Sequence, residues 1–203
     1  GLFTSTIAEA GAFIKTHDEL EIPNIQFHYA PAMIVDHGRT LLWGTGMSCH
    51  SCLLRPKSLG EVTLASADPF ADPLIDPKFL SHPDDMKDMV EGYKIMMKVL
   101  GSEPFSKYIS EHTQRPIDIN DDADIEQAIR EGADTVYHPV GTCKMGHDDM
   151  SVVDSRLKVH KVNGLRVVDA SIMPTIVGGN TNAPTIMIGE KASDMILEDW
   201  KIH

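Results

Sequence analysis

The hydrophobic and polar positions of this 203-residue chain follow two different periods. Runs rich in β-forming residues at 25–34, 41–54 and 61–66 are separated by turn residues and short connections, which predicts an antiparallel sheet. Apolar side chains at 86–102 and 122–133 recur at the three- and four-residue spacing of a helix. We therefore expect an α+β fold in which helices pack on one side of a mainly antiparallel sheet.

The remaining segments differ in character. The segment 68–85 is rich in proline and aspartate and predicts a surface loop. Residues 157–171 predict two strands joined by an Asn163-Gly164 turn, and the second arm is a nearly continuous apolar run, typical of a strand buried on both faces. A long amphipathic helix is expected over 182–200. A strand buried on both faces needs neighbouring strands, and because no parallel strand–helix units stand out, this part is interpreted as incomplete.

Composition narrows the classes of function. The net charge of −12 argues against nucleic-acid binding, which requires a basic surface. No apolar run reaches the length of a membrane span, and the N-terminal residues lack the pattern of a signal peptide. The local acidic cluster at Asp118, Asp121, Asp122 and Asp124 predicts a solvated loop that opens a helix.

The three cysteines predict neither a disulfide framework nor a metal site. Their odd number favours a reducing compartment, and we expect a cytoplasmic protein. Cys49 and Cys52 form a C-x-x-C pair, but no second pair completes a zinc site. Residues three apart on a strand also point to opposite faces, so no metal is expected there.

Three segments carry candidate chemistry. His138 stands before Pro139 and Gly141, which hold and bend the backbone and would aim its imidazole as a general base, although a turn histidine is the plainer alternative. Asp169 ends the apolar arm, where it would either face a ligand or cap a helix. The run GGNTN that includes Asn180 precedes a helix N-terminus, which suits a flat polar ligand or an ordinary turn.

In their order along the chain, these segments resemble a known family. The runs HPVGTCKMG and RVVDASIMPTIVGGNTNAPTIMIGEKASDMI, with IQFHYAP and LLRPKSLGEVTL nearer the N-terminus, resemble the glucose–methanol–choline (GMC) oxidoreductases. The choline dehydrogenase branch is the most similar. The resemblance extends from about Ala8 to Leu197, and its motifs are long and ordered.

The resemblance implies a division into two domains. Residues 1–150 match the substrate-binding domain, and 151–203 match the last strand and helix of an FAD-binding domain. Family members begin with a Gly-x-Gly-x-x-Gly turn for the cofactor, and the spacing of Gly44, Gly46 and Gly60 does not fit it. We therefore expect the C-terminal part of a longer enzyme, which needs a missing N-terminal FAD-binding domain and has little FAD affinity or turnover by itself.

Family members oxidise an alcohol to a carbonyl compound by hydride transfer to FAD. By that match, His138 is the catalytic base, and Asn180 takes a second catalytic position at which many relatives carry histidine. An asparagine cannot take a proton at neutral pH, so Asn180 would hold the hydroxyl group by hydrogen bonds. The same match implies four cofactor-binding residues: Asp169, Ala170, Asn182 and Ala183. The first two would lie by the ribityl–pyrophosphate region, and Asn182 would face the pyrimidine end of the flavin.

The implied substrate is a small primary alcohol, with choline as the reference case. Trp43 and Tyr137 are candidate pocket residues, and core packing is an equal alternative for both. Two other functions stay open: a non-catalytic substrate-binding module, and one chain of a two-chain flavoenzyme. An oligomer, and peripheral membrane association of the full-length enzyme, are also left open by the sequence.

Overall fold

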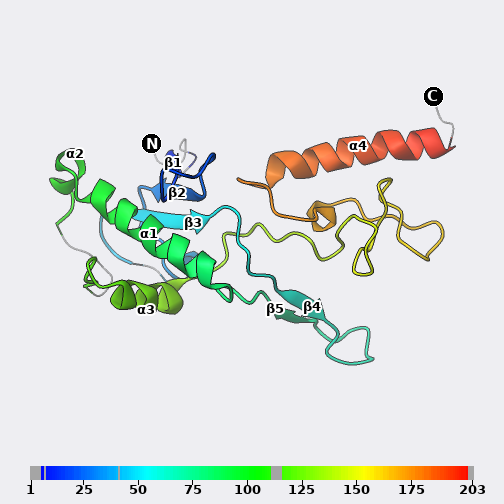
Figure 1. The fold of residues 1–203 in the computed structure, drawn as a ribbon, viewed down its shortest axis with the longest axis horizontal. Helices are drawn as coiled ribbons and strands as arrows, with labels where there is room; N and C mark the ends of the chain where they lie inside the picture. The colour runs from blue at the N-terminus through cyan, green and yellow to red at the C-terminus, as the bar shows by residue number, and fades with distance from the viewer. Residues whose placement is uncertain (1–5, 7, 41, 111–115, 201–203) are drawn as a thin grey trace. The chain divides into compact units, whose positions relative to one another are not determined.

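The computed structural model describes residues 6, 8–40, 42–110 and 116–200 (Figure 1). The extreme N-terminus and Leu41, where the second β-rich run was expected to begin, lie outside the described residues. The chain forms two compact units. Unit 1 comprises Gly1–Leu59 and Phe79–Asp134, and unit 2 comprises Gly60–Lys78 and Thr135–His203. The expected division at residue 150 concerns the domains of a longer protein and stays a prediction.

Unit 1 contains an antiparallel sheet, in the strand order β1-β2-β3. The strand expected at 61–66 does not join it, because residues 61–63 pair with residues 74–76 in a separate two-stranded sheet. Its strands are β1 (Ala10–Ile14), β2 (Ile25–Ala30) and β3 (Ser48–Leu53). β2 is shorter than the run that predicted it because Pro31, which follows it, has no N–H to donate to the ladder. A short 3-10 helix, η2 (Asp36–Gly38), lies in the connection to β3.

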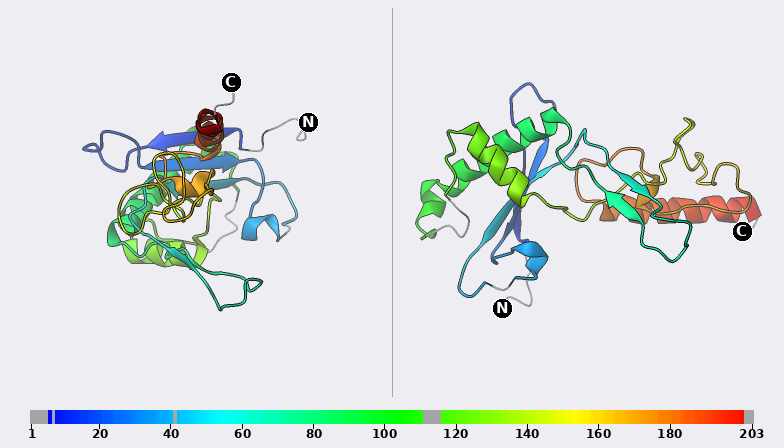
Figure 2. Two further views of the ribbon diagram at one scale, coloured as in Figure 1. Left: turned by 90° about the vertical axis from the view of Figure 1, so that its right-hand side faces the viewer. Right: turned by 90° about the horizontal axis from the view of Figure 1, so that it is seen from below.

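Helix α1 (Pro83–Leu100) covers one side of this sheet, and a second helix packs against α1 (Figures 1 and 2). α1 packs against β2 and β3 and also against α3 (Asp122–Gly132), so α1 is the middle layer. A short α2 (Glu103–Ser106) follows α1. The predicted α+β class is confirmed.

The apolar side of α1 faces two cores. Met96 packs with the sheet residues Ile25 and Phe27. Met86 packs with α3 through a second cluster that includes Ile125. Burying such side chains supplies much of the stabilisation of an amphipathic helix.

The ends of these helices follow from local chemistry. α1 begins three residues before the expected residue 86 because the His82 side chain accepts a hydrogen bond from Asp84 N, and Pro83 suits a first helical position. Asp121 caps α3 by accepting from Ala123 N at 3.0 Å. The acidic cluster is therefore a helix-opening loop, as predicted.

The two cysteines of the C-x-x-C pair lie on opposite faces of β3, as expected. Cys49 stands opposite Tyr29, and Cys52 stands opposite Gln26, at positions of opposite parity. Burial raises the pKa of both thiols. Among the described residues, no three His, Cys, Asp or Glu side chains gather into a group that could hold a metal ion.

Unit 2 contains fewer regular elements. β4 (Glu61–Thr63) and β5 (Leu74–Asp76) form a hairpin, η3 (Ala170–Ile172) is a 3-10 turn, and α4 (Asn182–Trp200) is the predicted last helix. β5 lies within the segment expected to be entirely loop. Within the part of the chain that the structure describes, no helix is both long and apolar enough to cross a membrane.

The apolar arm 165–171 departs from its prediction. The Asn163-Gly164 turn is present, with φ +75° at Gly164, but the arm forms only the isolated antiparallel bridge Lys158↔Arg166. Val168 is 36 % exposed. The expectation of a strand buried on both faces is therefore wrong for this structure, because no described segment provides a second ladder beside the arm.

Instead, the arm packs against a hydrophobic core that is formed by loops and by the helix α4. Six buried residues form this core of unit 2: Val153, Leu157, Ile172, Met173, Ile188 and Ala192. The first two lie in the irregular segment that precedes η3. The next two lie in η3 and at its end, and the last two lie in α4. This core brings the start of α4 and η3 close to the loop that carries His138, because Val140 of that loop packs against it.

Candidate functional site

The loop that carries His138 has a sharply bent backbone. Tyr137 adopts φ +64°, a left-handed conformation that is rare for an aromatic residue, and its N–H donates to Thr135 Oγ1 at 3.0 Å. Gly141 adopts φ +88°, where a side chain would be strained. Pro139 lies between these two bends. The local sequence therefore holds His138 in a narrow range of orientations.

Backbone hydrogen bonds attach this loop to η3. Cys143 N donates to Ser171 O at 3.0 Å, and Met145 N donates to Ile172 O at 2.8 Å. These bonds satisfy backbone groups that would otherwise lack partners in a loop. The His138 loop and η3 consequently form one local structure.

The two predicted catalytic residues meet in space. Asn180 Nδ2 lies 2.9 Å from His138 Nε2, although 42 positions separate the residues in the chain. His138 is half-buried, and Asn180 is exposed. One edge of the imidazole ring and one carboxamide group are therefore adjacent and accessible to solvent.

A third residue of this site was not predicted. Thr181 Oγ1 lies 2.8 Å from His138 Nδ1, and Thr181 is only 8 % exposed. The two nitrogens of His138 therefore each have a polar partner. The only sequence signal was that Thr181 directly follows Asn180 and precedes the predicted helix.

The arrangement suits proton transfer at Nε2. A neutral imidazole carries one N–H and one lone pair, and a lone pair at Nε2 can accept a proton from a hydroxyl group. Asn180 lies at the same edge and can hydrogen-bond to the oxygen of that group. The site therefore places one potential proton acceptor and one carboxamide at the same edge.

The predicted cofactor residues lie around the same core. Asp169 caps η3 by accepting from Ser171 N at 2.8 Å, which is the capping alternative, and Ala170 begins η3. Asn182 and Ala183 are the first residues of α4 and are exposed. η3 packs against α4, so the two pairs stand on elements in contact. Their roles toward a cofactor stay predictions.

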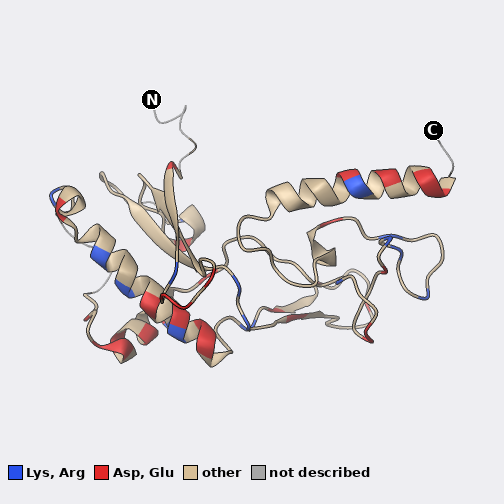
Figure 3. Ribbon diagram, turned by 45° about the horizontal axis from the view of Figure 1, so that its top comes forward, with Lys and Arg blue, Asp and Glu red and all other residues tan. Residues whose placement is uncertain are grey.

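No acidic side chain neutralises the positive end of the helix dipole at the start of α4. Its first turn has no acidic residue, and no charged side chain occurs before Glu190 (Figure 3). The first N–H groups of a helix have no intrahelical acceptors, and the helix dipole makes this end electropositive. An electron-rich group would be stabilised there.

The two candidate pocket residues are not core residues. Trp43 is 94 % exposed in unit 1, and Tyr137 is 64 % exposed in unit 2. The alternative of core packing is wrong for both. Their contact with a substrate stays a prediction.

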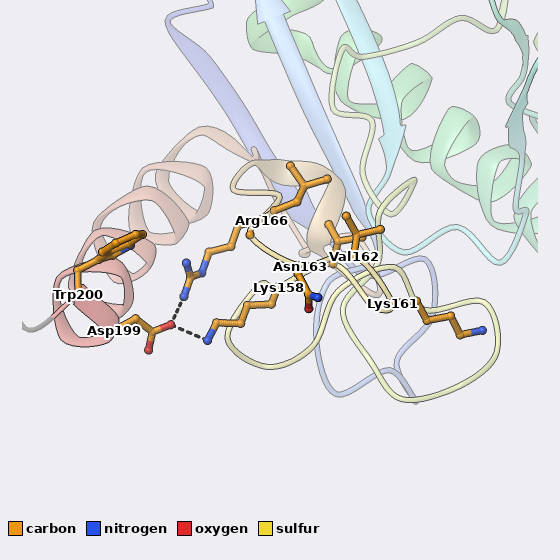
Figure 4. Close-up of a pocket in the computed structure, with 10 residues that line it drawn as sticks. Lys158, Lys161, Val162, Asn163, Arg166, Asp199 and Trp200 are labelled. Atoms are coloured by element: carbon orange, nitrogen blue, oxygen red, sulfur yellow. Dashed lines mark hydrogen bonds and ion pairs between the residues drawn. The ribbon is translucent and has the colours of Figure 1, made fainter.

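A separate hollow of about 450 Å³ in unit 2 contains none of the predicted site residues (Figure 4). Its polar centre is Asp199, which pairs with Lys158 at 2.6 Å and with Arg166. The hydrogen bond from Lys158, with those of the neighbouring guanidinium groups, lowers the pKa of Asp199 to about 2. This ion-pair cluster attaches the end of α4 to the Asn163-Gly164 hairpin.

Comparison with known proteins agrees with this geometry. The family model described as GMC oxidoreductase matches residues 56–189. The chain is 47 % identical to an alcohol dehydrogenase (acceptor) of Pseudomonas putida and 42 % identical to an oxygen-dependent choline dehydrogenase of Klebsiella pneumoniae, in each case over 97 % of its length. It resembles the structure of formate oxidase from Aspergillus oryzae with a TM-score of 0.84, at 31 % identity over 90 % of the chain. It spans 36 %, 35 % and 33 % of these three proteins, about a third of each.

Proposed function

The chain belongs to the GMC oxidoreductase family, and we propose that it forms the C-terminal, histidine-bearing part of an FAD-dependent alcohol dehydrogenase. The observation that carries the proposal is the 2.9 Å approach of Asn180 Nδ2 to His138 Nε2. The chain spans about a third of its relatives, which supports an N-terminal FAD-binding domain in the complete protein. Two relatives are named for alcohol or choline substrates, so a small primary alcohol is the proposed substrate class.

The residues present fit an FAD cofactor. The structural relative is named for FAD modification in formate oxidase, which supports the same cofactor in the complete protein. In this chain, Asn182 and Ala183 would offer the electropositive start of α4 to the flavin ring. Asp169 and Ala170 would lie along the ribityl–pyrophosphate part. When bound, FAD would accept the hydride from the substrate carbon.

The chain's own residues would control the proton and the alcohol oxygen. His138 Nε2 accepts the hydroxyl proton as the C–H bond breaks, so the alcohol loses one proton and one hydride and becomes an aldehyde. Asn180 holds the oxygen by hydrogen bonds while negative charge develops on it. The half-buried position of His138 and its two polar contacts hold the imidazole in place beside Asn180.

Replacement of the base tests this proposal. In the full-length, FAD-loaded protein, His138→Ala should lower turnover of a primary alcohol by roughly 10²- to 10⁴-fold, the usual contribution of a positioned base. Steady-state assays over a panel of alcohols measure it, with flavin absorbance confirming cofactor loading. His147→Ala is the matched control, because His147 is an exposed histidine close by in the chain. Near-normal turnover of His138→Ala would exclude His138 as the base.

A second measurement tests the dependence on the missing domain. We expect the 203-residue chain alone to bind FAD weakly or not at all and to show no turnover. Flavin absorbance of the purified chain after incubation with FAD measures this. A stoichiometrically flavin-loaded preparation would contradict it, and a second polypeptide that restores turnover would identify a two-chain enzyme.

A further inference from the structure

Thr181 has a fixed backbone at the junction between the site and α4. Its carbonyl oxygen accepts hydrogen bonds from Thr185 N at 3.0 Å and Thr185 Oγ1 at 2.7 Å, so it closes the first turn of the helix. The residue is 8 % exposed, so its side chain is surrounded by protein. A β-branched side chain is also restricted in its first torsion angle. The hydroxyl group is consequently held in one place, 2.8 Å from His138 Nδ1.

The contacts of the imidazole determine which nitrogen carries the proton. Asn180 directs Nδ2, which can only donate, toward His138 Nε2 at 2.9 Å, and this contact fits a lone pair on Nε2. The proton of the neutral ring then lies on Nδ1. The Thr181 hydroxyl can accept or donate, and beside Nδ1–H it accepts.

We propose that Thr181 is a positioning residue, whose buried hydroxyl accepts the hydrogen bond from Nδ1–H of His138 and keeps the lone pair of Nε2 at the edge shared with Asn180. The catalytic consequence rests on the proposed function, because only a base at Nε2 needs that tautomer. The tautomer of His138 itself does not rest on the proposed function. A hydrogen bond to one imidazole nitrogen sets the state of the other, as with partners that orient metal-bound or catalytic histidines.

The tautomer can be measured without FAD. In the chain labelled with ¹⁵N-histidine, the His138 ring signals, assigned by their loss in His138→Ala, should show a protonated Nδ1 and an unprotonated Nε2 at neutral pH. Thr181→Val has nearly the same shape but no hydroxyl, and should convert the ring to a mixture of both tautomers. Thr181→Ser retains the hydroxyl and should keep the wild-type pattern. Backbone amide spectra of the variants report whether the fold is retained.

Two outcomes would overturn the proposal. One is a wild-type His138 ring with its proton on Nε2. The other is a folded Thr181→Val variant with unchanged ring signals. If Thr181→Val does not fold, Thr181→Ala provides the same comparison with a smaller side chain.

Turnover separates this proposal from the function on which it rests. In the full-length, FAD-loaded protein, Thr181→Val should lower kcat by about 10- to 100-fold, as is usual for a residue that orients a catalytic histidine, with substantial rescue in Thr181→Ser. A changed tautomer with full activity in both Thr181→Val and His138→Ala would support the positioning contact and refute the proposed function.

Discussion

Units 1 and 2 differ in how their backbones are organised. Unit 1 is a sheet covered by α1, with α3 packed against α1, and its cores lie between regular elements. In the described part of unit 2, η3, α4 and irregular segments form the core, and the β4–β5 hairpin contributes no residue to it. All six predicted catalytic and cofactor residues lie in unit 2. The comparison shows that the regular unit is the easier one to predict, whereas the site depends on loops positioned by a small core.

A carboxylate stabilises each unit in a different way. Asp85 of unit 1 is 3 % exposed and accepts from Lys57 N and Ser58 N, both at 2.8 Å. Asp199 of unit 2 is partly exposed and binds cationic side chains instead. A buried carboxylate that accepts backbone N–H groups is expected to matter more than a cluster of charges near water.

The largest expected effects on stability concern the two cores. Ile25→Ala in unit 1 and Ile188→Ala in unit 2 should each lower the free energy of unfolding by about 2–5 kcal/mol, because each truncation leaves a cavity. Hydrogen exchange with mass spectrometry should show the loss of protection in the mutated unit. Ile186→Ala is the matched control on α4, because Ile186 is 59 % exposed and should have little effect. Equal loss of protection in both units for both variants would contradict separate cores.

An intermediate loss of stability is expected when Asp85 is replaced. Asp85→Ala leaves the N–H groups of Lys57 and Ser58 without their acceptor and should cost about 1–3 kcal/mol. Chemical denaturation measures the change. The neighbouring Asp84→Asn is the control, because the exposed Lys57–Asp84 pair should contribute little. A loss of stability as large in Asp84→Asn would refute the distinction between the two carboxylates.

The smallest loss of stability is expected when Asp199 is replaced, and this loss should depend on pH. Its pKa in the folded chain is about 2, below the ordinary 3.8, so its contribution is fully present above pH 3.8 and is lost as the pH falls toward 2. Asp199→Asn should remove this contribution at neutral pH and match the wild type near pH 2. Amide exchange at the end of α4, followed between pH 5 and 2, measures it. If the difference in amide exchange between the wild type and Asp199→Asn stayed constant over this pH range, it would contradict the assignment of this contribution to Asp199.

The regular elements could be predicted because their signals are local. The helix over 182–200 was predicted with both ends correct, and the caps of α1 and α3 lie within two residues of the groups that they satisfy. The antiparallel pairing of β2 and β3 was predicted for a similar reason, but β1 was not expected, and the strand expected at 61–66 pairs with β5 in a separate sheet. β5 was missed because it has only three residues within a segment rich in proline and aspartate.

The site was predicted only in part. His138 and Asn180 were expected to act together because their motifs resemble a family, and the structure brings them within hydrogen-bond distance. Thr181 was missed because a threonine before a helix is ordinarily a cap, and no local pattern shows that its hydroxyl faces an imidazole 43 positions away.

The sequence by itself determined where α3 and α4 begin and which face of α1 is apolar, because these depend on neighbours within a few positions. Tertiary structure alone decided that Thr181 and Asn180 contact opposite nitrogens of one ring. It also left the arm 165–171 with a single bridge. Contacts between distant segments and the pairing of strands depend on what the rest of the chain places beside them, which a local pattern cannot encode.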